Sequence, residues 1–168
     1  NTQVYKCLTR FEGGLHEFGT FRFDLEKVLE MGRNNPQHFQ LPDPGQNRNV
    51  RSKAVTDLER FFSLFPEPRL AEDLFITFEH GRILHLLSRT YPGLVSTCLP
   101  MFQREARKLL LTGGHRQLLM PSYATIACGL PLEELRQEWF AGIRLVRKTV
   151  DLFSAAMQQG VPTAETSG

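Results

Sequence analysis

The sequence has few cysteines and almost no net charge, and both shortages limit what the protein can be. Cys7, Cys98 and Cys128 are the only cysteines. They are odd in number and far apart, which argues against a disulfide framework and favours a reducing compartment. We therefore expect each to be a small buried apolar residue. The net charge of +2 is too small to indicate nucleic-acid binding by itself.

The sequence also has no long apolar run and no obvious targeting segment. A membrane-spanning helix needs roughly 20 apolar residues, so we expect no membrane span. The start, Asn1-Thr2-Gln3, has neither an initiator Met nor the regions of a signal peptide. We expect a piece of a longer or trimmed protein with a cytoplasmic location. Residues 161–168 have the composition of a linker-like tail, and residues 1–160 have the length of a single domain.

Apolar residues recur at steps of three and four through most of the chain, which predicts a mainly α fold. We expect a bundle of five to six helices, over about 24–32, 55–65, 70–90, 94–111, 116–127 and 131–160. The last of these has Pro131 at its start and two glutamates in its first turn, where the helix dipole favours negative charge. The N-terminal twenty residues are expected to be irregular, either a hairpin turning at Gly13-Gly14 or an extended arm.

No arrangement of residues predicts a metal site, a bound cofactor or a catalytic centre. His80 and His85 are five residues apart, which is about 140° around a helix, so their side chains diverge. There is no C-x-x-C pair. Cys98, Cys128 and Ser122 lie in no nucleophile motif, and the alternative of core thiols and a loop serine is the simpler one. We expect no catalytic residue, no cofactor and no zinc.

Basic residues form three clusters that could contact phosphates or an acidic protein surface. One lies at the end of a long polar loop over residues 33–51 and consists of Arg48, Arg51 and Lys53. The others lie on predicted helices, at 104, 107 and 108 and at 144, 147 and 148. A solvated helix face is the alternative for both helical sets. Because long loops are often functional, we expect Arg48, Arg51 and Lys53 to contact a partner.

Glu79 and Arg82 lie three residues apart on an otherwise apolar predicted helix, at a spacing that allows an ion pair. If the pair is exposed, it contributes little to stability. If it is buried, each charge needs its partner and further hydrogen bonds to offset desolvation. We expect a buried structural ion pair that links this helix to a neighbour.

The stretch around this pair resembles a known family. Phe78-Glu79-x-x-Arg82-Ile83, followed by Tyr91-Pro92-Gly93-Leu94, is similar to the helical region that precedes the von Willebrand factor A domain in partners of MoxR-type AAA+ ATPases. These partners are the nitric-oxide-reductase activation and Rubisco-activation proteins. His80 departs from the family, which has an acidic residue there. The D-x-S-x-S metal motif of the von Willebrand domain is absent from this chain.

The resemblance implies an adaptor domain, part of an activator that works with an AAA+ ATPase to remodel or mature a target enzyme. The residues alone predict a non-catalytic domain that binds a protein partner. Two alternatives stay open: a helical regulator that binds nucleic acid, which would need the basic faces to merge, and a small enzyme whose site forms from distant residues.

Overall fold

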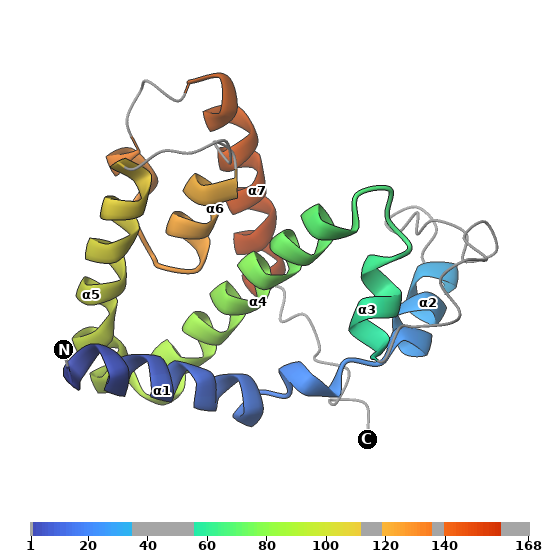
Figure 1. Ribbon diagram of the computed structural model, residues 1–168, viewed down its shortest axis with the longest axis horizontal. Coiled ribbons are helices and arrows are strands. Elements are labelled where there is room, and N and C mark those ends of the chain that lie inside the picture. The colour runs from blue at the N-terminus through green and yellow to red at the C-terminus, as the bar shows by residue number, and fades with distance from the viewer. Residues whose placement is uncertain (1, 35–55, 112–118, 136–139, 159–168) are drawn as a thin grey trace. The chain divides into compact units, whose positions relative to one another are not determined.

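The computed structural model describes residues 2–34, 56–111, 119–135 and 140–158. Every regular element in these ranges is a helix, so the predicted mainly α class is confirmed (Figure 1). Seven α-helices are described, one more than the upper expectation. They are α1 (Thr2–Glu17), α2 (Leu25–Asn34), α3 (Asp57–Phe62), α4 (Pro68–Thr90), α5 (Pro92–Leu111), α6 (Leu119–Ile126) and α7 (Phe140–Gln158), with 3-10 turns η1 (Thr20–Arg22) and η3 (Leu132–Glu134).

The contacts divide these helices into two units, which we describe separately. The first contains α1, α4 from Leu74 onward, α5, α6 and α7; the second contains η1, α2, α3 and the first residues of α4. The single domain expected over residues 1–160 remains a prediction. None of the helices in the described ranges is both long and apolar enough to cross a membrane.

Two clusters of buried residues form the core of the first unit. α6 lies between α5 and α7 (Figure 1) and shares one cluster with them, which includes Ala106, Ala124 and Val146. In the other cluster, Leu15 of α1 packs with Ile83 of α4 and Val95 of α5. Burial of these apolar side chains is the main force that holds the periodic segments of the sequence in helices.

The N-terminal segment is a helix, which corrects the expected hairpin or extended arm. Gly13 and Gly14 lie inside α1 rather than in a turn. A Cβ at Gly14 would be 3.0 Å from Ile83 Cγ2 and 3.3 Å from Leu87 Cδ1. The glycine therefore serves the close approach of α1 to α4, and this packing outweighs the low helix propensity of a glycine pair.

A second close approach occurs at Gly81, in the middle of α4. A Cβ at this position would overlap Ile126 Cγ2 of α6 and lie 2.8 Å from Phe153 Cζ of α7. One turn earlier, Phe78 stacks on the same Phe153, with ring centroids 6.1 Å apart. Gly81 thus allows α4 to pack directly against two other helices.

The second unit begins its helices with polar caps. Asp24 Oδ1 accepts a hydrogen bond from the Lys27 amide, and Asp57 Oδ2 accepts one from the Leu25 amide, which links α2 to the start of α3. Thr56 and Glu59 form a capping box at the N-terminus of α3. Phe61 contacts the rings of Phe23, Phe62 and Phe65, so an aromatic cluster holds this small unit together.

The helix predicted to start at Pro131 starts later. After η3 the backbone at Leu135 is extended, with φ −69° and ψ 121°, and α7 begins at Phe140. Leu135 is 5% exposed and belongs to the buried cluster of α5, α6 and α7. Burial of this side chain takes precedence over the local helix signals of Pro131 and the two glutamates. The predicted tail, residues 161–168, lies outside the described ranges.

Candidate functional site

Glu79 and Arg82 form a bidentate ion pair on α4. Arg82 Nε donates to Glu79 Oε2 at 2.8 Å, and Nη2 donates to Oε1 at 2.6 Å. The two side chains are only 13% (Glu79) and 17% (Arg82) exposed. Because both charges have lost most of their hydration, each depends on the other to offset the cost of burial.

The same residues connect α4 to the end of α1. Arg82 Nη2 also donates to the Phe18 carbonyl oxygen at 2.9 Å, just after the last residue of α1. At the far end of α4, the Tyr91 hydroxyl donates to Glu17 Oε1 at 2.9 Å. This hydrogen bond, together with the negative charge of Glu17, raises the pKa of Tyr91. Residues that carry the family resemblance therefore fasten α1 to α4.

A second polar group on α4, His80, meets α1 and α6. Its Nδ1 lies 2.8 Å from the Tyr123 hydroxyl oxygen, and its ring packs edge-on against Phe11. Burial lowers the pKa of His80, and the nearby Glu12 and Glu79 oppose that shift. Burial also raises the pKa of Tyr123 to about 12. At neutral pH this site is an uncharged imidazole beside an uncharged phenol.

Two nucleophile candidates, Ser122 and Cys128, lie in and just after α6. Burial raises the pKa of Cys128 to about 11, so the group is a thiol at neutral pH and a poor nucleophile. Ser122 is 5% exposed, inside α6. The His80 imidazole engages Tyr123 through Nδ1. Within the described ranges, Cys128 packs against the buried apolar cluster of α5, α6 and α7, and such surroundings disfavour an activated thiolate.

His80 and His85 do not lie in a metal cluster. Across the described part of the chain, no three His, Cys, Asp or Glu side chains come close enough together to hold a metal ion. His85 is half-buried on α4, five residues along the helix from His80, which is more than one turn.

Cys7 and Cys98 form a disulfide, which corrects the expectation that all three cysteines are unpaired. The bond joins α1 to α5 with the two Cα atoms 5.5 Å apart, although 91 residues separate them in the sequence. Cys128 remains the free cysteine. The odd count therefore reflects one pair and one partly buried thiol, and long separation along the chain does not prevent pairing once helices pack.

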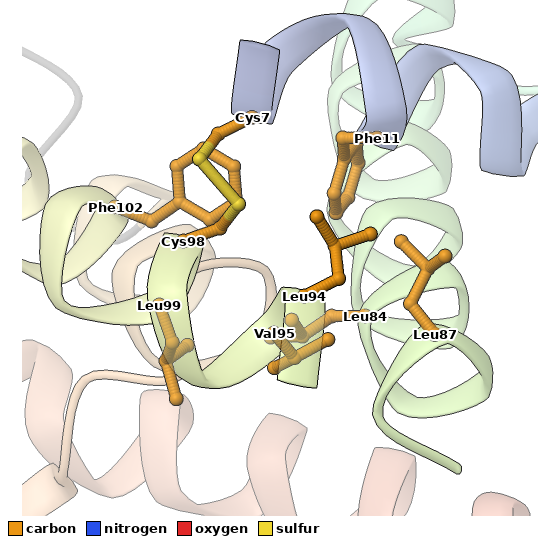
Figure 2. A pocket seen from close by; sticks show the side chains of 9 residues that line it. All are labelled: Cys7, Phe11, Leu84, Leu87, Leu94, Val95, Cys98, Leu99 and Phe102. Carbon is orange, nitrogen blue, oxygen red and sulfur yellow. A yellow bond between two sulfur atoms is a disulfide. The ribbon is translucent and has the colours of Figure 1, made fainter. Parts of the chain in front are cut away.

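A small apolar pocket lies beside this disulfide (Figure 2). Phe11, Phe102, Leu84 and Leu99 are among the residues that line it. Its volume of about 10 Å³ is the minimum for a single water molecule, and an apolar lining offers water no partner. The pocket is a packing gap in the core, too small for an organic ligand.

The basic clusters differ in how far carboxylates neutralise them. On α5, Arg107 makes a bidentate pair with Glu134, while Arg104 and Lys108 both contact Glu105. On α7, Arg144, Arg147 and Lys148 are exposed and, within the described ranges, have no ion pair. The predicted partner-binding residues Arg48, Arg51 and Lys53 lie outside those ranges.

Sequence reasoning missed the His80–Tyr123 contact and the disulfide. Tyr123 lies 43 residues from His80, and no local pattern connects them. For the disulfide, a signal was present: Cys7, Phe11, Leu15 and Phe18 follow a helical spacing that would have placed Cys7 on the buried face of a helix.

No family model, curated protein or solved structure matches the chain. The resemblance to partners of MoxR-type ATPases accordingly stays a prediction.

Proposed function

We propose that this chain is a protein-binding domain without a catalytic role of its own. One contrast carries the proposal. The reactive side chains of the first unit, His80, Tyr123 and Cys128, are partly buried, and burial shifts the pKa of each toward its uncharged form. Large apolar side chains, by contrast, lie on the surface, with Leu145 52% and Leu152 61% exposed on α7. Reactive groups held in their uncharged forms suit a scaffold, and exposed apolar groups suit contact with another protein.

The proposed partner is an AAA+ ATPase of the MoxR type, with the chain as the adaptor part of an activator that remodels or matures a target enzyme. The support is the resemblance around Glu79, Arg82 and Tyr91, together with the contacts these residues make. They fix the corner formed by α1, α4 and α5. A motif that maintains the fold can be shared by domains whose binding surfaces differ.

Nucleic-acid binding has less support than protein binding. Phosphate contacts need several free cations on one surface. On α5 the cations are already neutralised by Glu105 and Glu134. The exposed cations of α7 alternate with apolar residues, which suits a protein surface better than a phosphate backbone.

A cytoplasmic location is part of the proposal because an AAA+ partner consumes ATP. In that compartment, Cys7 and Cys98 would be thiols, since disulfides persist mainly in oxidising compartments. Thiol labelling of protein unfolded directly from its native cells tests this point. Three labelled cysteines per chain agree with a cytoplasmic location, and one labelled cysteine contradicts it.

The proposed function is tested by a binding experiment with purified components. The full chain is immobilised and incubated with a MoxR-type ATPase from the same organism, with ATP, with ADP and without nucleotide. We expect retention that depends on the nucleotide, and no retention of an AAA+ ATPase from another class. If no MoxR-type ATPase of that organism binds, the adaptor proposal is wrong. Retention of duplex DNA that weakens with salt would favour the nucleic-acid-binding regulator.

A further inference from the structure

Two exposed leucines define a narrow apolar seam along α7. Leu145 and Leu152 are seven residues apart, so they lie about 10.5 Å from each other along the helix and within about 20° around it. They are 52% and 61% exposed. They occupy equivalent positions in two consecutive seven-residue repeats, the repeat by which paired helices place apolar residues in their interface. We call Leu145, Leu152, Arg144 and Lys148 the α7 seam.

The seam is separate from the side of α7 that builds the core. Val146 is 2% exposed in the cluster shared with α5 and α6. Val150 packs against the same cluster, and Phe153 stacks on Phe78 of α4. Because the core face already has its neighbours, the two leucines contribute little to the fold and stay in contact with solvent.

Positive charge lies along one edge of the seam. Lys148 is about 60° and Arg144 about 100° around the helix from Leu145, on the same side, whereas Arg147 is about 160° away. Both seam cations are exposed, and neither is paired with a carboxylate within the described ranges. They differ in this from the cations of α5. Asp151 lies on the same side of α7, about 120° around the helix from Leu145, but no ion pair joins it to either seam cation within the described ranges. The seam therefore combines an apolar stripe with two cations that have no carboxylate partner there.

We infer that the α7 seam binds an acidic amphipathic helix of a protein partner. Such a helix would place apolar side chains against Leu145 and Leu152 and carboxylates beside Arg144 and Lys148, in the manner of helix-in-groove and coiled-coil pairing. The inference rests on the proposed function, protein binding, and adds the surface and the chemistry of the partner.

Other occupants fit the seam less well. A helix that binds a membrane surface inserts a broad apolar face, and on α7 the broad face is in the core. In an antiparallel pair of two copies of this chain, Lys148 would face Lys148 across the interface, and like charges at that distance repel. In a parallel pair, the cations would face the uncharged edge at Thr149. Only an acidic partner neutralises Arg144 and Lys148.

A synthetic helical peptide tests the inference directly. The peptide has three heptads with leucine at positions a and d and glutamate at e and g, so that repulsion between glutamates disfavours its self-association. Binding to the full chain is measured by fluorescence anisotropy at two salt concentrations. We expect binding that weakens as salt rises, and no binding of a peptide with lysine in place of glutamate.

Variants then locate the site. Leu145→Gln with Leu152→Gln should weaken peptide binding at least about tenfold, because hot-spot contacts are lost. Arg144→Glu with Lys148→Glu should do the same by reversing the charge. Arg147→Glu is the matched control on the same helix and should leave the affinity nearly unchanged. All the changed residues are exposed, and an unchanged melting temperature confirms that each variant is folded.

The results separate this inference from the proposed function. If the ATPase binds the parent chain and the seam variants equally and the peptide does not bind, the seam inference is wrong while the function stands. If the peptide binds through the seam but no ATPase does, the inference stands and the ATPase proposal fails. Seam-dependent binding to phosphatidylserine vesicles without peptide binding, or a dimer abolished by the seam variants, would overturn the inference in favour of a lipid surface or a second copy.

Discussion

Replacing Arg82 with Met should destabilise the first unit far more than replacing an exposed arginine of the same geometry. The change removes the bidentate partner of Glu79 and the donor to the Phe18 carbonyl oxygen. Glu79 is 13% exposed, so its charge would remain buried without its guanidinium. Breaking a buried pair in this way typically costs about 3–5 kcal/mol, and we expect a loss near 3 kcal/mol because the pair keeps some contact with water.

The chain contains a matched control for burial. Arg107 also donates Nε and Nη2 to both oxygens of one carboxylate, that of Glu134, at 2.7 and 2.9 Å. Its side chain is 45% exposed and that of Glu134 is 41% exposed. Exposed pairs contribute about 0–1 kcal/mol. Arg107→Met should therefore cost far less stability than Arg82→Met, although the hydrogen-bond geometry of the two pairs is almost the same.

Denaturant unfolding followed by circular dichroism measures both losses. A third variant, Glu79→Met with Arg82→Met, should recover much of the stability lost in Arg82→Met, because no buried charge is left unpaired. Equal losses for Arg82→Met and Arg107→Met would refute the reasoning, since burial would then have no effect on the pair. A double variant no more stable than Arg82→Met would show that the Phe18 hydrogen bond or packing dominates instead.

Three further perturbations follow from the same contacts. Reduction of the Cys7–Cys98 disulfide, which closes a loop of about 90 residues, should lower the free energy of unfolding by about 2–4 kcal/mol, and the reductant should have no effect on a variant with serine at both positions. Burial lowers the pKa of His80 below its ordinary value of 6.5, so as the pH falls the unfolded chain binds a proton at this residue before the folded chain does. The free energy of unfolding should therefore be greatest above pH 6.5 and fall at lower pH. Thermal melts between pH 7 and 5 should show a smaller fall for His80→Gln than for the parent. Gly81→Ala should destabilise by about 1–3 kcal/mol through overpacking, whereas Gly13→Ala, with open space around its Cβ position, should stabilise by up to about 1 kcal/mol in thermal melts.

The sequence predicted most helices because their apolar periodicity reflects the same packing that buries them. α4 and α5 lie within a few residues of their expected bounds, separated as expected at Tyr91 and Pro92. The prediction was wrong for α1, where the glycine pair and the β-type residues near Tyr5 favoured a hairpin. Gly14 is there for its contact with α4, and a contact between distant segments leaves no local signal.

The existence of the Glu79–Arg82 ion pair could be predicted from the sequence, because two opposite charges three residues apart on a helix lie on the same face and can reach each other. The contacts of Arg82 with Phe18 and of His80 with Tyr123 could not, because each joins residues 43 or more positions apart. The disulfide shows the same limit. An odd cysteine count shows only that at least one cysteine has no partner within the chain. Here that residue is Cys128, which is partly buried.

The role of α4 follows from how many neighbours surround it. His80 meets α1 and α6, Gly81 meets α6 and α7, and Arg82 and Ile83 meet α1. A helix in contact on nearly every side is a scaffold and has little free surface with which to recognise a partner. The residues that carry the family resemblance should therefore affect partner binding only by unfolding the domain. Arg82→Met should reduce binding and melting temperature together, whereas changes in the α7 seam should reduce binding at constant melting temperature. That difference separates the residues that maintain the domain from those that we propose recognise its partner.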